Sequence, residues 1–506
     1  MSRGQRLAAG STVPAMGPAW ELHHEEGSIA PCPACKEDGA SDFPAQARGG
    51  LGLPGGLGSC ARLARMPRGM RLVIVGAGPI GLETALLGAH LGYEVAVLEV
   101  GRVGENLRSW GHVRMFSPWE MNCSSLGLRV LRGEGVRPCR DAGTAPTGRQ
   151  YLADYLLPLA KSRPLRGAVR ERTRVLAISR DATLKEDLPG NDARAVRPFR
   201  ILAERGGRQE VHAADVVIDA SGTWGQMRPL GDGGIPVPGE SQAASFIDRG
   251  IPNLASPRVA ALFAGRTTLL VGAGHSAATS AVALSALAAR HPRTRVIWVF
   301  RSTRRPLYAG VPGELLPARG ALCAEASRLA AGRNPRFEAC PGSVVESILV
   351  KGGRDRGRLE VSLRGGGRRR RKIVDRIIAN VGSTPDSSIH SELQVHLCYA
   401  TCGPIKLAAV LLGKGDDCLA QPAPSADLLS HPEPDFYIIG SKSYGRNATF
   451  LLRAGLEQVD AVFAGLARGA RPLQDAVPSP GRRRTGSSGV SATGPRNSGH
   501  LPETRA

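Results

Sequence analysis

Two short glycine-rich segments are the residues of this chain whose types and spacing are best suited to chemistry. The first is GAGPIG, from Gly76 to Gly81, and the second is GAGHSA, from Gly272 to Ala277. Such a turn lets backbone N–H groups approach a pyrophosphate, and the helix that follows presents its positive end to the phosphates. Two of them predict a protein that holds two dinucleotides at once, and hence electron transfer between a flavin and a nicotinamide.

In the first segment, each of the three glycines meets one requirement of dinucleotide binding. Gly76 permits the sharp turn, Gly78 keeps a Cβ away from the pyrophosphate, and Gly81 lets the helix pack closely on the strand, with Pro79 between them. Glu99 follows 23 residues after Gly76, at the end of the next expected strand. A carboxylate there accepts hydrogen bonds from ribose hydroxyls and repels a 2′-phosphate, which predicts FAD or NAD rather than NADP.

The second segment has small residues at the same three positions, with Ala277 serving where the helix packs closely. The strand that follows, RVIWVF, ends at Arg301, and Arg304 lies just beyond it without an acid nearby. Basic side chains at that point can pair with a 2′-phosphate, so Gly272 and Gly274 are predicted to hold NADPH rather than NADH. The alternative explanation for the basic group is the general abundance of arginine, since the chain has 58 Arg and 8 Lys.

The elements that must position these turns alternate between strand and helix, the pattern of an α/β fold. Buried strands are expected over residues 72–75, 94–98, 216–219, 268–271, 296–299, 377–379 and 437–439. A helix is expected over 80–91 and another over 449–458. The basic segment 365–372 (GGGRRRRK) is expected to form an exposed hairpin tip.

Composition and charge exclude several classes of function. The 506-residue chain has no run of about 18 apolar residues and no convincing signal peptide, so we expect a cytoplasmic protein without a membrane segment. The net charge of +22 comes with no recognition motif, so nucleic acid is not an expected partner. Among the ten cysteines, the pair Cys32 and Cys35 lacks a second half, so no metal is expected. Cys398 and Cys402 are near enough in sequence to pair, although two unrelated thiols are the simpler interpretation.

Three further segments, together with the order of the turns, resemble the two-dinucleotide-binding flavoproteins. That superfamily includes thioredoxin reductases, disulfide reductases and class B flavoprotein monooxygenases. The segments are VVIDASGT (216–223), IANVGSTP (378–385) and YIIGS (437–441). The resemblance implies that FAD is contacted by Ala220, Ser221, Gly222, Gly440 and Ser441, and that the chain leaves the NADPH domain near Gly382. Many relatives have an aspartate where this chain has Ser441.

The resemblance covers roughly residues 70–470 and implies two Rossmann-like domains, with the NADPH domain inserted into the FAD domain. The FAD domain is predicted to comprise 70–262 and 383–473, and the NADPH domain 263–382. Disordered tails are predicted over 1–69 and 474–506. Met66 and Met70 are alternative starts, so the sequence leaves open whether the first 65–69 residues belong to the natural protein. Relatives often dimerise, which allows a homodimer, while the sequence itself is silent on assembly.

The positions of cysteines distinguish the branches of this superfamily. Disulfide reductases carry a CxxxxC after the ribose acid, but residues 100–122 contain no cysteine. Thioredoxin reductases carry a CxxC in the NADPH domain, where this chain has only Cys323 and Cys340, far apart. The loop after Glu99 instead resembles the flavin-facing loop of class B monooxygenases.

That resemblance implies a FAD-dependent, NADPH-consuming monooxygenase that uses O₂ to oxygenate a small organic substrate through a peroxyflavin. Trp110, His112 and Phe116 are then flavin-proximal candidates, with plain core aromatics as the alternative interpretation. The class B fingerprint FxGxxxHxxx(F/W) is missing, since Leu269 stands where its histidine would be. An NADPH:acceptor reductase without oxygen insertion is therefore the second hypothesis, and a non-catalytic redox sensor is the third. The segments GDGGIPVPGE (231–240) and YGRNATFL (444–451) look like features of a bacterial subgroup of FAD/NAD(P)-binding oxidoreductases, and this resemblance implies the fold and the cofactors but no substrate.

Overall fold

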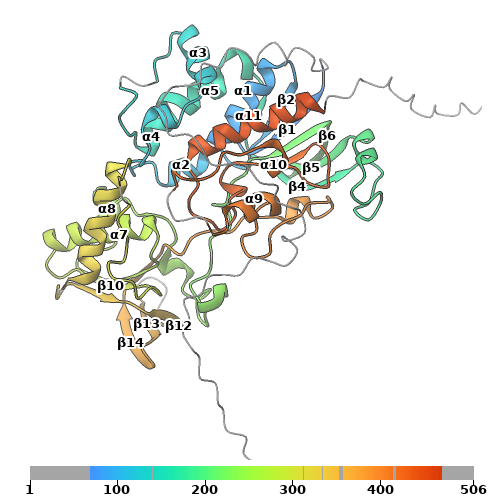
Figure 1. The fold of residues 1–506 in the computed structure, drawn as a ribbon. Helices are drawn as coiled ribbons and strands as arrows, with labels where there is room; N and C mark the ends of the chain where they lie inside the picture. The colour runs from blue at the N-terminus through green and yellow to red at the C-terminus, as the bar shows by residue number, and fades with distance from the viewer. Residues whose placement is uncertain are drawn as a thin grey trace, which may run out of the picture.

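A computed structural model describes residues 69–138, 141–311, 313–332, 334–352, 357–413 and 418–469. The predicted terminal tails and the Cys32–Cys35 pair lie outside these ranges. Figure 1 shows one unit around β1, β2 and α11 and a second around α7, α8 and β10. The α/β class with two parallel sheets, which the alternating pattern predicts, is confirmed.

The first unit is built on a five-stranded parallel sheet in the order β16-β7-β1-β2-β3. Its strands are β1 (Arg71–Val75), β2 (Glu94–Leu98), β3 (Val169–Arg170), β7 (Val216–Asp219) and β16 (Phe436–Ile438). Val75 lies opposite both Leu98 and Asp219, so the three central strands end together at one carboxyl edge. The edge strand β16 comes from the far end of the chain and completes the sheet.

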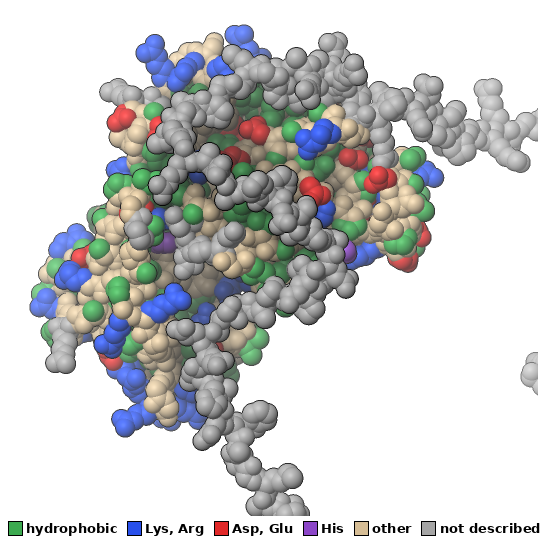
Figure 2. Space-filling view, viewed as in Figure 1, with side chains coloured by type: hydrophobic (Ala, Val, Ile, Leu, Met, Phe, Trp, Pro, Cys, Tyr) green, Lys and Arg blue, Asp and Glu red, His purple; other side chains and the backbone are tan. Residues whose placement is uncertain are grey.

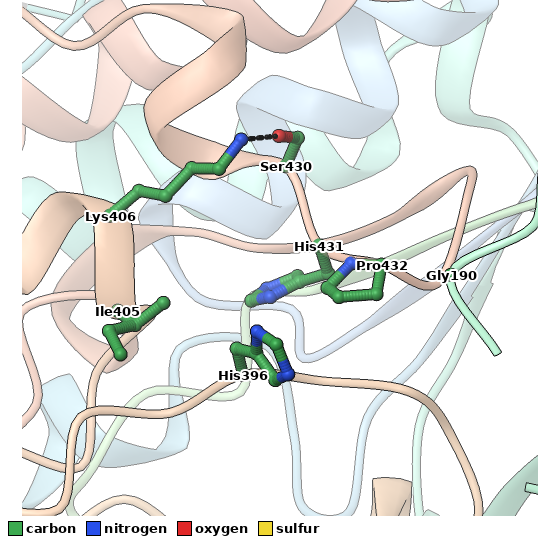
Figure 3. Close-up of a pocket in the computed structure, with 7 residues that line it drawn as sticks. All are labelled: Gly190, His396, Ile405, Lys406, Ser430, His431 and Pro432. Carbon is green, nitrogen blue, oxygen red and sulfur yellow. Dashed lines mark hydrogen bonds between the residues drawn. The ribbon is translucent and has the colours of Figure 1, made fainter. Parts of the chain in front are cut away.

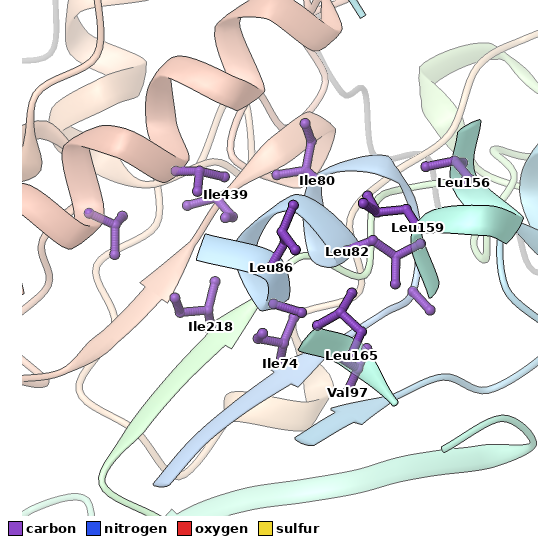
Figure 4. Packing of buried hydrophobic residues seen from close by; sticks show 14 of the residues in the cluster. Ile74, Ile80, Leu82, Leu86, Val97, Leu156, Leu159, Leu165, Ile218 and Ile439 are labelled. Carbon is purple, nitrogen blue, oxygen red and sulfur yellow. The ribbon is translucent and has the colours of Figure 1, made fainter. Parts of the chain in front are cut away.

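Two helices, α1 (Pro79–His90) and α11 (Leu452–Arg468), bury their apolar sides on this sheet. Figure 4 shows Ile74 and Ile218 of the strands packed below Leu82 and Leu86 of α1. A Cβ on Gly455 would lie 2.5 Å from Cδ1 of Ile80, so the absence of a side chain there lets α11 approach α1. The chain between β2 and β3 adds α2 (Glu105–Ser109), α3 (Ser125–Gly133), α4 (Gly148–Tyr151) and α5 (Leu157–Lys161).

The second unit repeats this plan with a parallel sheet in the order β11-β10-β9-β15-β8. Its strands are β8 (Ile247–Asp248), β9 (Thr267–Val271), β10 (Arg295–Val299), β11 (Phe337–Cys340) and β15 (Arg376–Ala379). The helices α7 (His275–Arg290) and α8 (Pro317–Ala331) pack on it around the fully buried Trp298. Strand β8 precedes residue 263, where the sequence places the start of the NADPH domain, and yet it pairs with β15.

Each unit also contains a three-stranded antiparallel sheet, which directly precedes β7 in the first unit and β15 in the second. The first consists of β4 (Thr173–Arg180), β5 (Phe199–Arg205) and β6 (Arg208–Ala214) and leads into β7. The second consists of β12 (Ser343–Lys351), β13 (Arg358–Gly365) and β14 (Arg368–Val374) and leads into β15. The short helices α6 (Pro257–Ala260), α9 (Ile405–Leu411) and α10 (Ala426–Leu429) complete the described part of the fold.

Two of the predicted elements need correction. The hairpin tip predicted over 365–372 is present but shorter, because the turn is made by Gly366 and Gly367 alone while Arg368–Val374 forms β14. Arg369 and Arg371 are exposed and pair with Glu346 and Glu360, which lets the run continue as a strand. Figure 2 shows Lys and Arg side chains gathered around this end of the molecule.

The helix predicted over 449–458 begins later, at Leu452. The Asn447 side chain accepts hydrogen bonds from the backbone N–H and the hydroxyl of Thr449, at 2.9 and 2.8 Å, and holds these residues in a turn. Asparagine competes with helical hydrogen bonding in this way. Among the described residues, no helix combines the length and apolar character needed to cross a membrane.

Candidate functional site

The glycines of the first turn divide into two that the fold requires and one that it does not. Gly76 has φ +101°, and a Cβ there would lie 2.9 Å from the carbonyl oxygen of Ala220. A Cβ on Gly81 would lie only 1.9 Å from the oxygen of Gly76. Gly78 has an ordinary extended conformation, and a Cβ there would meet no atom within 4 Å. The space beside Gly78, at the start of α1 and Pro79, fits a ligand rather than a packing contact.

Glu99 lies where the sequence places it, directly after β2, and is 8% exposed. Its two carboxylate oxygens accept hydrogen bonds from the backbone N–H groups of Ala77 and Gly101, each at 2.7 Å. Burial raises the pKa of Glu99, while these two N–H groups act in the opposite direction. A carboxylate offers about four lone-pair directions. Glu99 therefore shapes the turn and keeps acceptor capacity for ribose hydroxyls.

The ends of β7 and β16 meet through a buried ion pair that the sequence interpretation missed. The Lys442 ammonium lies 2.6 Å from a carboxylate oxygen of Asp219 and 3.0 Å from the Ser221 hydroxyl, with both charged side chains at most 2% exposed. Burial alone would raise the pKa of Asp219, but the Lys442 ammonium holds it below its ordinary value. The only signal in the sequence was a lysine within three residues of an apolar strand.

The predicted flavin-contacting residues of these two strands come together. A Cβ on Gly222 would lie 3.4 Å from the Ser441 hydroxyl, and one on Gly440 would lie 3.5 Å from Ile80 in α1. The Gly440 N–H donates to the buried Gln458 of α11 at 2.7 Å. Helix α1, β7 and the short helix η10 (Gly440–Lys442) therefore meet at one carboxyl edge, where open α/β sheets bind ligands.

The second turn likewise contains one glycine that the fold requires and one that it does not. Gly272 has φ +127°, and a Cβ there would lie 2.1 Å from the oxygen of Asn380. Gly274, by contrast, would place a Cβ in open space, and Ala277 is fully buried. Asn380, also missed from sequence, accepts a 2.7 Å hydrogen bond from Ser280 and donates to Gly250. The turn is thus built by β9, β15 and α7 around a space beside Gly274.

The predicted basic residues follow the end of β10 at this same edge. Arg301 and Arg304 are both exposed, and within the described ranges neither forms an ion pair. Trp298, on the same strand, is oriented by a 2.8 Å hydrogen bond to the oxygen of Gly272. The guanidinium groups are therefore available to an anion next to the second turn.

Aromatic side chains connect the two units between the turns. The Phe116 ring lies 5.3 Å from the ring of His275, the first residue of α7, and Trp110 lies 6.2 Å from Trp224. Within the described part of the chain, the buried Trp110 Nε1 and His112 Nε2 atoms have no hydrogen-bond partner. Burial, and then the charge of Arg149, lower the pKa of His112. Orphaned polar atoms of this kind are expected where a ligand supplies the missing partner.

The two chain segments that cross between the units are hydrogen-bonded to each other. The Arg228 N–H donates to the oxygen of Gly382, and the Thr384 N–H donates to that of Gln226, both at 2.9 Å. The Ser383 hydroxyl donates to that of Thr223 at 3.0 Å. Gly382 thus lies where the chain leaves the second sheet, at the position predicted for it.

An open pocket of about 300 Å³ lies away from both turns, mainly in the C-terminal return of the first unit. Figure 3 shows the imidazoles of His396 and His431 facing each other inside it, while Lys406 donates to Ser430 above them. None of its lining residues belongs to a glycine turn. In the described ranges, no group of three or more His, Cys, Asp or Glu residues is arranged to hold a metal.

Two histidines near this cavity make stability depend on pH. Burial lowers the pKa of His390 to about 4 and that of His431 to about 3, from an ordinary value of 6.5. The unfolded chain then binds more protons below pH 6.5, so stability is present above 6.5 and is lost as the pH falls.

His390 is only 3% exposed. We expect its lowered pKa alone to reduce the free energy of unfolding of the protein by about 2 kcal/mol between pH 7 and pH 5. Urea unfolding of His390→Leu should show a flatter pH dependence than wild type. His291→Leu, at the exposed end of α7, is the control. An unchanged slope in His390→Leu would refute the assignment.

Comparison with known proteins agrees with this architecture. Residues 73–186 match the family described as pyridine nucleotide-disulphide oxidoreductase. A comparison with curated proteins finds no match by sequence. Many solved structures share the fold, and three of them serve for comparison. The bacillithiol disulfide reductase from Bacillus cereus has a TM-score of 0.56 at 18% identity, over 79% of this chain and 100% of that one.

The other two structures come from monooxygenases. An ornithine N-hydroxylase from Kutzneria sp. 744 has a TM-score of 0.53 at 15% identity, covering 80% of this chain and 100% of its own. A FAD-bound cadaverine monooxygenase from Erwinia amylovora has a TM-score of 0.52 at 13% identity, covering 83% and 99%. Residues 73–186 thus resemble the pyridine nucleotide-disulphide oxidoreductase family, and the described chain shares the fold of these flavoprotein structures.

Proposed function

We propose that the protein is a FAD-dependent, NADPH-consuming monooxygenase acting on a small organic substrate. The observation that carries the proposal is the loop after Glu99. It has no cysteine up to Asn122, and its Phe116 contacts His275 of the second unit. Disulfide chemistry needs a thiol pair next to the flavin, whereas oxygenation needs an apolar, water-excluding wall there.

FAD and NADPH supply the hydride and electron transfer when bound, and the chain positions them. Glu99 accepts hydrogen bonds from a ribose, and the free N–H groups at the starts of α1 and α7 hold the two pyrophosphates. The buried Trp110 Nε1 and His112 Nε2 atoms, which have no hydrogen-bond partner among the described residues, would pair with a bound ligand. Phe116 and His275 exclude water where the two units meet.

The stoichiometry of the reaction tests the proposal. A monooxygenase consumes one NADPH and one O₂ per product, with one oxygen atom in the product and the other in water. NADPH oxidation, O₂ uptake and hydrogen peroxide are measured together while candidate substrates are added to the holoenzyme. We expect a substrate to raise O₂ uptake without raising peroxide, and ¹⁸O₂ to label the product. Oxygen uptake recovered entirely as peroxide for every compound would contradict oxygenation.

An NADPH:acceptor reductase is the second candidate, favoured by one observation. Leu269, which replaces the histidine of the class B fingerprint, is fully buried inside β9 and available to no ligand. A reductase would consume NADPH as fast without O₂ as with it, provided that an acceptor such as a quinone is present. The same measurements under nitrogen therefore separate the two functions.

The preference for NADPH predicts a selective effect at Arg301. We expect Arg301→Ala to raise the KM for NADPH about 10-fold, or about 1.4 kcal/mol, and to leave the KM for NADH unchanged. Arg295→Ala is the matched control, because Arg295 is exposed at the opposite end of β10. Steady-state kinetics with both nucleotides measure the effect, and equal losses for NADPH and NADH would refute a role in binding the 2′-phosphate.

A further inference from the structure

The segment that follows β10 returns to the second glycine turn and places a tyrosine beside it. The Tyr308 hydroxyl donates to the carbonyl oxygen of Gly274 at 3.3 Å. Its ring stacks on that of His275, the first residue of α7, with the ring centroids 6.3 Å apart and the planes at 22°. Phe116 of the first unit approaches the same His275 ring at 5.3 Å. Aromatic rings from both units therefore meet where α7 begins.

A serine of α8 holds Tyr308 in this position. The Ser327 hydroxyl accepts a hydrogen bond from the backbone N–H of Tyr308 at 3.1 Å and donates to its carbonyl oxygen at 3.5 Å. Ser327 is buried. Leu307 and Tyr308 also pack against the buried cluster around Trp298. The position of the tyrosine is thus set by α8 and by the core, and does not depend on the hydrogen bond of its hydroxyl.

The Tyr308 hydroxyl is a donor that lacks a close acceptor among the described residues. Its 3.3 Å distance from the Gly274 oxygen exceeds the roughly 2.5–3.0 Å that is usual for an O–H···O hydrogen bond. Burial raises the pKa of Tyr308, so the phenol keeps its proton at neutral pH. Because a hydrogen bond to an ionised oxygen is shorter and stronger than one to a carbonyl, a phosphate would be a better acceptor.

The start of α7 has space and free donors for such a phosphate. No side chain of the described residues caps this helix at Gly274, and its first turn contains no acidic residue. By contrast, α3 is capped by the Ser124 side chain, which accepts from the N–H of Gly127. A Cβ on Gly274 would meet no atom within 4 Å. The first N–H groups of α7 and the Tyr308 hydroxyl therefore border the same open space.

We propose that Tyr308 is a further binding residue of the nicotinamide-nucleotide site, with its hydroxyl donating to the pyrophosphate and its ring forming one wall. On binding, the hydroxyl exchanges the distant Gly274 oxygen for a phosphate oxygen. NADPH and NADH share the pyrophosphate, so Tyr308 contributes to the affinity for both, whereas Arg301 is assigned to the 2′-phosphate of NADPH alone. This inference rests on the proposed function, because it adds a residue to the nucleotide site proposed there.

Calorimetric titration of the FAD-loaded enzyme with NADP⁺ and with NAD⁺ tests the assignment. We expect Tyr308→Phe, which removes only the hydroxyl, to raise the dissociation constants of both nucleotides by the same factor, about 10-fold. FAD content at the wild-type level shows that the variant folds. Tyr399→Phe is the control, because Tyr399 is 82% exposed and precedes α9, and it should bind both nucleotides as wild type does.

A second variant separates the ring from the hydroxyl. Tyr308→Leu should raise both dissociation constants beyond those of Tyr308→Phe, and equal constants in the two variants would refute the role of the ring. Unchanged binding by Tyr308→Phe would overturn the proposal, and so would a loss confined to NADP⁺, which places the hydroxyl at the 2′-phosphate. Wild-type enzyme that binds neither nucleotide would contradict the proposed function itself. The titrations need no turnover, so their outcome is independent of the fate of O₂.

Discussion

Gly78→Val is expected to yield a folded protein that purifies without FAD, with FAD affinity reduced at least about 100-fold, or about 2.7 kcal/mol. Gly78 has φ −78° and ψ −176°, which valine adopts readily, and a Cβ there would meet no protein atom within 4 Å. Only a bound pyrophosphate would occupy that space. Flavin absorbance of the purified protein and titration of the apoprotein with FAD measure the loss.

The matched control is Gly225→Val, since Gly225 also has no atom within 4 Å of an added Cβ and lies outside both turns. We expect it to retain FAD. The unfolding free energy of apo Gly78→Val should stay within about 0.5 kcal/mol of wild type, unlike that of Gly81→Val, whose Cβ would overlap the oxygen of Gly76. Retention of FAD by Gly78→Val would show that the first turn does not bind the pyrophosphate.

Lys442→Met is expected to destabilise the protein by about 3–5 kcal/mol, the second large effect. The substitution leaves the fully buried carboxylate of Asp219 without the ammonium that lies 2.6 Å from it. Methionine keeps most of the apolar volume, so the loss reports the uncompensated charge rather than a cavity. Urea unfolding of the apoprotein at pH 7 measures it.

A second variant separates charge from packing. Adding Asp219→Asn to Lys442→Met removes the stranded charge and should restore part of the stability, so that the two substitutions are strongly non-additive. Lys406→Met is the control, because its partner Asp427 is 78% exposed and such pairs contribute at most about 1 kcal/mol. Additive losses at Lys442 and Asp219 would contradict the ion-pair account.

The sequence predicts the parallel strands well because their apolar runs are continuous and end at glycines. Thr267–Val271 and Arg295–Val299 extend the predicted strands by a single residue each. The last helix was predicted to begin three residues too early, because a hydrogen bond from the Thr449 N–H to the Asn447 side chain outweighs the local helical pattern. The hairpin tip was predicted too long, because Arg369 and Arg371 pair with Glu346 and Glu360 on the two preceding strands of the same sheet, and this lets the basic run form β14.

The residues of the candidate site also separate into those that local sequence predicts and those that depend on distant contacts. Glu99 and the glycines were predictable, because their roles are set within one strand, one turn and one helix. Lys442 and Asn380 were missed, since each acts on a residue at least 100 positions away, Asp219 in one case and Ser280 in the other. The contact of Phe116 with His275 likewise depends on how two units are placed, which no local pattern encodes.

The late position of β16 sets an order for folding during synthesis. The second sheet is made from one continuous stretch, Ile247 to Ala379, and can close while the ribosome is still working. The first sheet waits for Phe436, and Asp219 waits for Lys442, 223 residues later. Contacts at such separations form slowly. The nascent chain therefore holds a finished nucleotide-binding unit within an unfinished one, and a truncation before residue 436 removes the counter-charge of Asp219 as well as an edge strand.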